Sequence, residues 1–310
     1  MRSSDLYERD QPNFLIEPNY TFERYTMNDM EMQSPSSWKS KKPVSAPIAW
    51  MGGKSLLANW IPEHFPPHKT YVEPYGGMAN VLLKKRPSQI EVYNDIDSRL
   101  VNFFQVIRDP EKLQVLQRLC ELTPYSRSEF GAAVQASEPT DPIQRAHWFF
   151  VRCRQARGGL GSLELTPGAW ATSTRVRREM PEPVSKYLSA IDGLPDVAGR
   201  LRNMVIESLP AINILEKYDQ SDVLFYCDPP YPHSTLANDK QSLYGFTMSE
   251  SDHSVFLNKI KSLKGKVIVS SYSSPMYDSV LADWSKVEKQ THVQFSNSGG
   301  SRTEAIWKNY

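Results

Sequence analysis

The strongest constraint on the fold is an apolar strand that ends abruptly at two prolines. Residues 223–225, Val-Leu-Phe, lead directly into the hexapeptide Tyr-Cys-Asp-Pro-Pro-Tyr at residues 226–231. A short apolar run bounded by a turn is typical of a buried strand. The prolines have a fixed φ angle and no N–H to donate, so the strand ends there and presents Asp228 and Tyr231 at its carboxyl edge. Open α/β sheets bind ligands at that edge, so we expect a site there.

The residues of this turn suit the activation of a planar amino group. The amino nitrogen of adenine is a poor nucleophile because its lone pair is delocalised into the ring. The carboxylate of Asp228 and the backbone carbonyl of Pro229 are able to accept its N–H hydrogens, and Tyr231 is able to stack on the base. The alternative is a turn that only ends a strand and carries a solvated aspartate.

Composition places the chain among ordinary globular proteins. Its 310 residues, 40% of them hydrophobic, suffice for one large domain or a domain with an insertion, and its net charge of +1 indicates no particular partner. The cysteines, Cys120, Cys153 and Cys227, are far apart and match neither a zinc site nor a disulfide framework, which favours a reducing compartment. With no signal core and no run long enough to span a bilayer, a soluble cytoplasmic protein is expected.

Residues 1–45 are predicted to form a polar N-terminal arm. They carry charges of both signs and several prolines without a sustained hydrophobic period, which indicates a flexible segment or one that orders only against the body or a partner. Lys39, Lys41 and Lys42 make its end basic, and a solvated linker is the favoured explanation of these charges.

A glycine turn with a lysine follows the arm. Residues 50–54 read Trp-Met-Gly-Gly-Lys and precede a helical pattern over residues 56–61, which the prolines at 66–67 close. A nucleotide-triphosphate loop is excluded because its first glycine would fall at Ile48. Bare N–H groups beside the Lys54 ammonium suit an anion such as an amino-acid carboxylate; a plain loop before a helix is the alternative.

Two further strands are predicted to end in acids. Residues 71–73 form a short strand that ends at Glu73 and continues into Pro-Tyr-Gly-Gly at 74–77, and residues 89–93 form another that ends in Asn94 and Asp95. The three spaced glycines of dinucleotide sites are absent, which disfavours a pyrophosphate cofactor. An acid after the second strand is placed to bind ribose hydroxyls, so the two strands together predict half of a nucleoside-cofactor site.

The remaining chain alternates between strands and helices. We expect strands at 204–209, 266–272, 291–295 and 303–307, and helices at 212–218, 252–263 and 276–284. The short turn Ser298–Ser301 implies an antiparallel hairpin at one edge of an otherwise parallel sheet. The long segment 232–246 either folds over a bound base or is a surface loop.

An arginine-rich segment interrupts this alternation. Residues 109–203 are predicted to be mostly helix and loop. Between residues 145 and 178 the chain has one acid, Glu164, and seven arginines: Arg145, Arg152, Arg154, Arg157, Arg175, Arg177 and Arg178. Arginines mixed with glycines, hydroxyls and tryptophans suit contacts to phosphates and base edges; a solvated helical face is the alternative.

Taken in order, these motifs resemble the Dam-type adenine-N6 DNA methyltransferases. That family carries Trp/Tyr-x-Gly-Gly-Lys, Glu/Asp-Pro-Tyr/Phe-Gly-Gly, Asn-Asp, a target-recognition insertion and Asp-Pro-Pro-Tyr, and this chain has each of them between residues 46 and 310. The resemblance implies an α/β fold, namely a mostly parallel Rossmann-like methyltransferase sheet with an antiparallel C-terminal edge hairpin and an inserted, mostly helical target-recognition domain. The catalytic domain would comprise residues 46–108 and 204–310, and the insertion residues 109–203.

The resemblance also implies ligands and site residues. S-adenosyl-L-methionine would be the methyl donor and double-stranded DNA the partner, with neither metal nor membrane, in a bacterial or phage-encoded monomer or weak dimer with a possible restriction-modification role. The catalytic residues would be Asp228, Pro229, Pro230 and Tyr231. The cofactor residues would be Trp50, Gly52, Gly53, Lys54, Glu73, Pro74, Tyr75, Gly76, Gly77, Asp95, Leu209, Pro210 and Asp228. The seven arginines above would contact DNA.

One departure leaves the target sequence open. Better-known members carry Asn-Arg-x-x-x-Asn-Gly where this chain has Arg-Cys-Arg-Gln-Ala-Arg-Gly-Gly at 152–159, so GATC recognition is not supported. Two alternative functions also stay open: methylation of cytosine N4 or of RNA, and nucleic-acid binding without catalysis. Aspartate rather than serine or asparagine at position 228 favours adenine.

Overall fold

A computed structural model describes residues 43–50, 52–158, 166–235, 246–292 and 301–310. Residues 1–42 of the predicted arm, Glu164, the 298–300 turn and most of the 232–246 segment lie outside the described residues. The end of the predicted arm already belongs to the body, because Val44 is buried and its N–H donates to the carbonyl of Leu83 over 3.1 Å.

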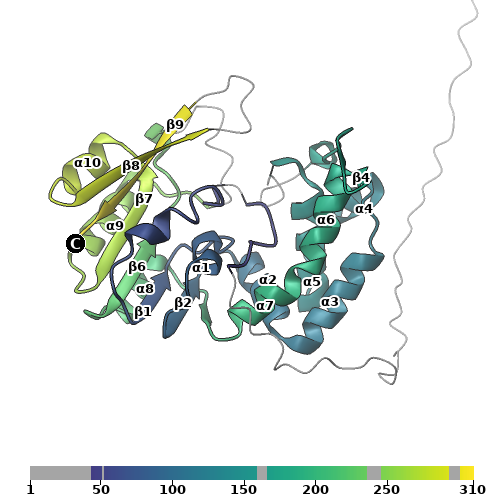
Figure 1. Cartoon of the computed structure of the whole chain (residues 1–310), viewed down its shortest axis with the longest axis horizontal. Helices are drawn as coiled ribbons and strands as arrows, with labels where there is room; N and C mark the ends of the chain where they lie inside the picture. The colour runs from purple at the N-terminus through teal and green to yellow at the C-terminus, as the bar shows by residue number, and fades with distance from the viewer. Residues whose placement is uncertain (1–42, 51, 159–165, 236–245, 293–300) are drawn as a thin grey trace, which may run out of the picture. The chain divides into compact units, whose positions relative to one another are not determined.

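The described residues form a seven-stranded mixed sheet in the order β5-β2-β1-β6-β7-β9-β8 (Figure 1). Its strands are β1 (Thr70–Glu73), β2 (Ile90–Asn94), β5 (Val205–Glu207), β6 (Val223–Cys227), β7 (Lys266–Tyr272), β8 (Ser285–His292) and β9 (Ser301–Lys308). Neighbours from β5 to β7 are parallel, whereas β9 is antiparallel to both β7 and β8. The mostly parallel sheet with an antiparallel edge is therefore confirmed.

Helices cover both faces of the sheet because its strands are apolar on both sides. On one face Val72 and Phe225 pack with residues of α8 (Ala211–Lys217), α9 (Glu250–Lys261) and α10 (Pro275–Val280). On the other, Tyr71 and Leu224 pack with α1 (Asn80–Lys84), α2 (Ser98–Arg108) and the 3-10 helix η2 (Ile61–His64). Alternate residues of one strand thus belong to two different cores.

The segment between α2 and β5 is mostly helical, as predicted. It contains α3 (Pro110–Leu122), α4 (Arg127–Gln135), α5 (Pro142–Gln155), η4 (Pro167–Ala169), the two-stranded hairpin β3 (Val176–Arg177) and β4 (Met180–Pro181), α6 (Glu182–Asp192) and α7 (Leu194–Leu201). Side chains of Asp109, Ser126 and Asp141 accept backbone N–H groups at the starts of α3, α4 and α5. Figure 1 shows these helices grouped beside α2.

The helices of this segment do not bury a core of their own. Phe149 and Phe150 of α5 lie 5.8 and 6.2 Å from Phe103 of α2, measured between ring centroids. Their cluster continues to the buried residues of α1 and to Tyr71 and Leu224 of the sheet. The insertion is therefore packed onto the sheet through α2 and also through α7, where Arg200 pairs with Glu91 of β2.

Several elements differ from the sequence predictions. The strand expected at 204–209 is β5 (Val205–Glu207), and the helix expected at 276–284 is α10 (Pro275–Val280). Residues 55–60 form turns followed by η2 rather than an α-helix, because Pro62 has no N–H to continue an α-helical ladder. The strand predicted at 291–295 begins earlier, at Ser285, and residues 293–295 lie outside the described part. None of the helices among the described residues has the length and apolar character that a membrane crossing requires. Nor do those residues contain a group of three or more His, Cys, Asp or Glu side chains placed to hold a metal ion.

Candidate functional site

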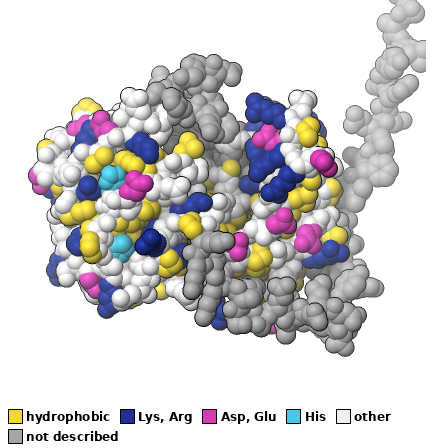
Figure 2. Space-filling model, in the orientation of Figure 1, with side chains coloured by type: hydrophobic (Ala, Val, Ile, Leu, Met, Phe, Trp, Pro, Cys, Tyr) yellow, Lys and Arg dark blue, Asp and Glu magenta, His cyan; other side chains and the backbone are white. Residues whose placement is uncertain are grey.

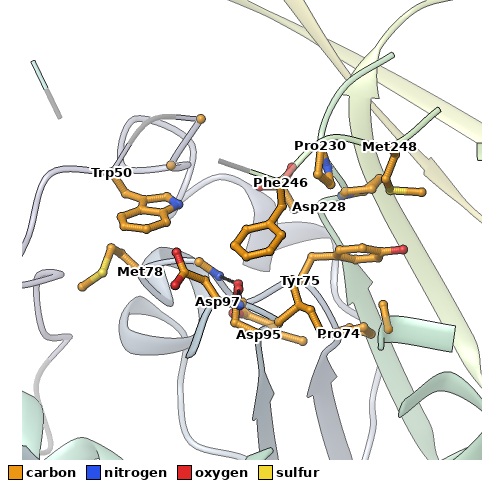
Figure 3. A pocket seen from close by; sticks show the side chains of 18 of the residues that line it. Trp50, Pro74, Tyr75, Met78, Asp95, Asp97, Asp228, Pro230, Phe246 and Met248 are labelled. Carbon is orange, nitrogen blue, oxygen red and sulfur yellow. Dashed lines mark hydrogen bonds between the residues drawn. The ribbon is translucent and has the colours of Figure 1, made fainter. Parts of the chain in front are cut away.

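A pocket of about 570 Å³ opens at the carboxyl ends of β1, β2 and β6. Asp95 follows β2 and Asp228 follows β6, and both line this one pocket. Every residue assigned above to the cofactor or to catalysis also lines it, except Leu209. In Figure 3, Trp50 and Met78 lie on one side of the pocket and Tyr75, Pro230 and Met248 on the other, with Phe246 between them.

The turn after β1 is fixed by the end of β2. Gly76 donates its N–H to the carbonyl of Asn94 over 2.8 Å, and a Cβ on Gly76 would come within 2.3 Å of the Tyr93 ring. Gly77 has a φ of +47°, which favours glycine. Its N–H donates to Oδ2 of Asp95 over 2.8 Å. Only glycines therefore fit this approach of two strand ends.

Asn94 joins a third strand end to this turn. Its Nδ2 donates to the carbonyls of Pro74, at 2.8 Å, and of Leu209, at 3.0 Å. Its Oδ1 accepts the N–H of Leu209 at 2.9 Å. One buried amide thus holds the segments after β1 and β5 against the end of β2, and this fixes the floor of the pocket.

Asp95 is held by backbone donors in a buried position. Its Oδ1 accepts the N–H of Asp97 over 2.8 Å, in addition to the Gly77 bond on Oδ2. Burial raises the pKa of Asp95 to about 6, against the effect of these hydrogen bonds. Each oxygen keeps a lone pair, so the carboxylate is able to accept further hydrogen bonds from a ligand.

Asp228 is anchored through one of its two oxygens. Lys54 Nζ lies 2.7 Å from Oδ1, and the hydroxyl of Ser270 donates to the same atom over 2.8 Å. Within the described residues no partner is found for Oδ2. Burial lowers the pKa of Lys54, but the carboxylates of Asp228 and Glu304 outweigh it and raise that pKa above its usual value. Burial also raises the pKa of Asp228, against the effects of the Lys54 ammonium and the Ser270 hydrogen bond. The lysine therefore remains protonated, and the anchored carboxyl group keeps one free oxygen.

Glu73 is a second buried acid of the pocket, at the end of β1. It accepts a hydrogen bond from the Tyr71 hydroxyl over 2.6 Å. Burial raises the pKa of Glu73 to about 8, so the side chain is mostly protonated at neutral pH.

Tyr231 is packed more closely than a free stacking platform would be. Its side chain is 7% exposed, and its hydroxyl donates to Oε1 of Glu304. Lys54 Nζ lies 4.6 Å from the ring centroid, and the ring of Tyr272 meets it edge-on at 4.7 Å. The orientation of this ring is therefore set by neighbours on three sides.

A comparison with known protein families shows to which family the chain belongs. The family model described as D12 class N6 adenine-specific DNA methyltransferase matches residues 50–145 and 180–294, more than half of the chain. The chain belongs to this family. It is also similar to the DNA adenine methylase of Vibrio cholerae serotype O1, in the strains Classical Ogawa 395 and El Tor Inaba N16961. Each alignment has 25% identity over 228 residues and covers 67% of this chain and 74% of the relative.

Of the two residues after β5 that were predicted to contact the cofactor, Leu209 and Pro210, only the proline lines the pocket. Pro210 lines the pocket, whereas Leu209 packs against the core on the α8 and α9 face of the sheet. In this D12-family chain the apolar and aromatic lining comes instead from residues such as Tyr75, Ile212 and Phe246. Phe246 follows a segment without a core pattern, so its place in the pocket had no local signal.

The seven arginines of the D12-family chain do not share one environment. Arg145 and Arg152 both bind the Glu138 carboxylate, at 2.9 and 3.0 Å, and Arg145 also donates to Ser98. Arg154 is largely covered and donates to the carbonyl of Lys186. These three guanidinium groups have partners inside the protein, which leaves them less free for an external phosphate.

The other four arginines are exposed. Arg157 donates to the carbonyl of Gly168 over 3.1 Å, and Arg178 to the Ser189 hydroxyl over 2.9 Å. Arg175 and Arg177 lie at the β3–β4 hairpin, whose turn places Arg178 at a φ of +52°. Figure 2 shows Lys and Arg side chains gathered over the part of the view where Figure 1 labels β4 and α6. Residues 146–179, which hold six of the seven arginines, fall outside the family match.

Proposed function

We propose that this chain transfers a methyl group from S-adenosyl-L-methionine to the N6 amino group of adenine at a specific sequence of double-stranded DNA. The observation that carries the proposal is the single pocket shared by Asp95 and Asp228, with the Glu73–Gly77 turn also in its wall. A nucleoside donor and an amine acceptor both have to reach one cavity for direct transfer.

The charges of the pocket support this donor. The acids Asp95, Asp97, Asp228 and Asp252 line it together with Glu73, which is mostly protonated at neutral pH, whereas its cations Lys54 and Arg99 are paired with Asp228 and Asp97. Acids therefore exceed cations, which suits a ligand that carries an ammonium and a sulfonium group. The free lone pairs of Asp95 suit ribose hydroxyls, and Tyr75, Ile212 and Phe246 offer apolar surface to a purine.

The chemistry needs little more than orientation. The donor, when bound, supplies an electrophilic methyl group on a positively charged sulfur, which leaves as a neutral thioether. Oδ2 of Asp228 and the carbonyl of Pro229 accept the N–H hydrogens of the target amine and direct its lone pair toward that methyl group. The methylated amine then loses one N–H proton, which Oδ2 of Asp228 or solvent accepts. Because Lys54 and Ser270 hold Oδ1, the acceptor geometry exists before the base arrives. Catalysis is then chiefly positioning and electrostatic preorganisation.

The base has to leave the duplex to reach this pocket. Enzymes that modify bases extrude the target nucleotide and stack it on an aromatic side chain, and Tyr231 is the ring beside Asp228. Arginines of the insertion, foremost the exposed Arg157, Arg175, Arg177 and Arg178, would hold the DNA phosphates and read base edges.

Replacement of Asp228 by Asn tests this function. The variant keeps an oxygen for Lys54 and Ser270 but loses the carboxylate, so methyl transfer should fall by at least about 100-fold while the donor still binds. The measurement is incorporation of labelled methyl groups into DNA, followed by digestion to nucleosides, with D283N as the surface control.

The products separate the competing functions. N6-methyladenine supports the proposal, whereas N4-methylcytosine or methylated RNA supports the alternative acceptors. A wild-type chain that binds DNA but neither binds the donor nor methylates is a non-catalytic binder. D228N with nearly full activity removes Asp228 from catalysis.

A further inference from the structure

Glu304 is an acid buried in an otherwise apolar part of β9. The residues after it are Ala305, Ile306 and Trp307, all buried, and Glu304 itself is 5% exposed. In the sheet it stands opposite Tyr272 of β7. A buried carboxylate is costly unless it is hydrogen-bonded or paired, so its contacts indicate why the position is acidic.

Both partners of Glu304 belong to the proposed active site. Its Oε1 accepts the hydroxyl of Tyr231, and the same oxygen lies 3.7 Å from Lys54 Nζ. Lys54 in turn pairs with Asp228 at 2.7 Å. Glu304 is not among the residues that line the pocket, so it stands behind the two groups rather than beside a ligand.

We infer that Glu304 is a positioning residue for methyl transfer: it fixes the Tyr231 ring through the hydroxyl and holds Lys54 between two carboxylates. This rests on the proposed function of the pocket. Through Tyr231 it sets the plane on which the extruded base stacks. Through Lys54 it limits how far the ammonium is drawn toward Asp228, whose free oxygen has to receive the amine.

The charge of the cluster is part of this role. Burial raises the pKa of Glu304 above its usual value, against the effect of the Lys54 ammonium. When Glu304 is ionised, one ammonium is shared by two carboxylates, and the group has a net negative charge beside a cationic donor. Without Glu304, Lys54 neutralises Asp228 alone and the Tyr231 hydroxyl loses its acceptor. A polar hydroxyl left without a partner in a buried site favours another ring orientation.

Two substitutions separate the hydrogen bond from the charge. E304Q keeps an oxygen that can accept the Tyr231 hydroxyl but removes the charge, and E304A removes both. E288Q is the matched control, because Glu288 lies on the neighbouring strand β8, is exposed and pairs with Lys286. Y231F removes the hydroxyl and keeps the ring.

The main readout is the single-turnover methylation rate of the full chain on unmethylated bacterial genomic DNA. E304A should lower this rate by about 10- to 100-fold, the usual effect of losing a hydrogen bond to a charged group. E304Q should lose less, and E288Q should match the wild type. The dissociation constant for S-adenosyl-L-methionine should stay within about threefold, because Glu304 lies outside the pocket. The E304A/Y231F double variant should be no slower than E304A alone.

A spectroscopic readout tests the contact without catalysis. Chains labelled with 3-fluorotyrosine give a fluorine resonance for Tyr231, assigned as the one missing in Y231F. It should shift in E304Q and E304A and not in E288Q. The inference is overturned if E304Q folds, the Tyr231 resonance does not shift and both Glu304 variants keep the wild-type rate. It is also overturned if the rate loss of the E304A/Y231F double variant equals the product of the two single losses. If the wild type itself makes no N6-methyladenine, the proposed function fails, and the fluorine shift alone decides whether Glu304 holds Tyr231.

Discussion

At the carboxyl end of β1, Glu73 gives the pocket a proton that a ligand can displace. Burial raises its pKa to about 8, so the free protein carries this group mostly protonated at neutral pH. Asp95, on the same wall, has a pKa of about 6 and is mostly ionised there. The two acids therefore titrate in separate ranges, and of the two only Glu73 titrates near pH 7.5.

Binding of S-adenosyl-L-methionine at pH 7.5 should release protons. A cationic ligand beside Glu73 favours the carboxylate and lowers the pKa of this side chain. At a pH between the pKa of the complex and that of the free protein, the complex therefore binds fewer protons than the free protein. Affinity should accordingly rise as the pH increases from about 6 to 8, and level off above. Calorimetry in buffers of different ionisation enthalpy measures the release, and E73Q, which keeps an acceptor for the Tyr71 hydroxyl, should abolish it. Equal heats in all buffers for the wild type would contradict a protonated Glu73.

Residues of the site differ in how far the sequence predicts them. Asp95 and Asp228 each follow a strand, and parallel strands bring their carboxyl ends to one edge, so their shared pocket follows from local patterns. Glu304 acts through β9, whose pairing with β7 joins distant parts of the chain. Phe246 likewise reaches the pocket from outside any predicted element. Neither position has a local pattern that distinguishes it from an ordinary strand or loop residue.

Among the elements, the β3–β4 hairpin carries exposed arginines of the insertion. Val176, beside Arg175 and Arg177, is 76% exposed, and both residues of the turn, Arg178 and Glu179, have positive φ values. A tight hairpin with little burial of its own side chains presents them to a partner rather than to the core.

Arg177→Ala should weaken DNA binding and make it less dependent on salt. If Arg177 neutralises one phosphate, the slope of log affinity against log salt concentration should fall in magnitude by about 0.9. Arg118→Ala on α3 is the control, because Arg118 is also exposed and already pairs with Glu121. Fluorescence anisotropy with labelled duplex DNA from 50 to about 200 mM salt measures both slopes. An unchanged slope in Arg177→Ala would place this arginine outside the DNA interface.

The predicted element boundaries are wrong where solvent exposure or a proline obscures the hydrophobic pattern. β8 reads Ser-Lys-Val-Glu-Lys-Gln-Thr-His, and as an edge strand it needs few apolar residues, so its first half gave no strand signal. In residues 56–61 the apolar spacing indicates a helix, but Pro62 interrupts the ladder after a single turn. The long buried strands β6 and β7 were predicted closely because apolar runs are unambiguous there.

At the scale of the whole molecule, the arginine-rich insertion shares one core with the sheet. Between ring centroids, Phe149 of α5 lies 6.1 Å from Trp50, which lines the pocket, and Phe150 lies 5.6 Å from Tyr187 of α6. A continuous chain of packed rings therefore leads from the pocket wall through α5 to α6. Sequence composition marked the insertion as a separate region but gave no measure of this packing, because aromatic residues of a shared core and of an independent one look alike in sequence.

A shared core predicts one cooperative unfolding transition for the insertion and the sheet. Phe150→Ala removes a fully buried ring that contacts both α2 and α6, and should lower the free energy of unfolding by about 3 to 5 kcal/mol. The loss should appear as a single shifted urea transition, with circular dichroism and tryptophan fluorescence coincident, because the insertion shares its core with one face of the sheet. Leu122→Ala, at an exposed position of α3, should leave the midpoint nearly unchanged. Two resolved transitions, of which Phe150→Ala shifts only one, would show instead that the insertion folds independently and that its contact with α2 is an interface between two domains.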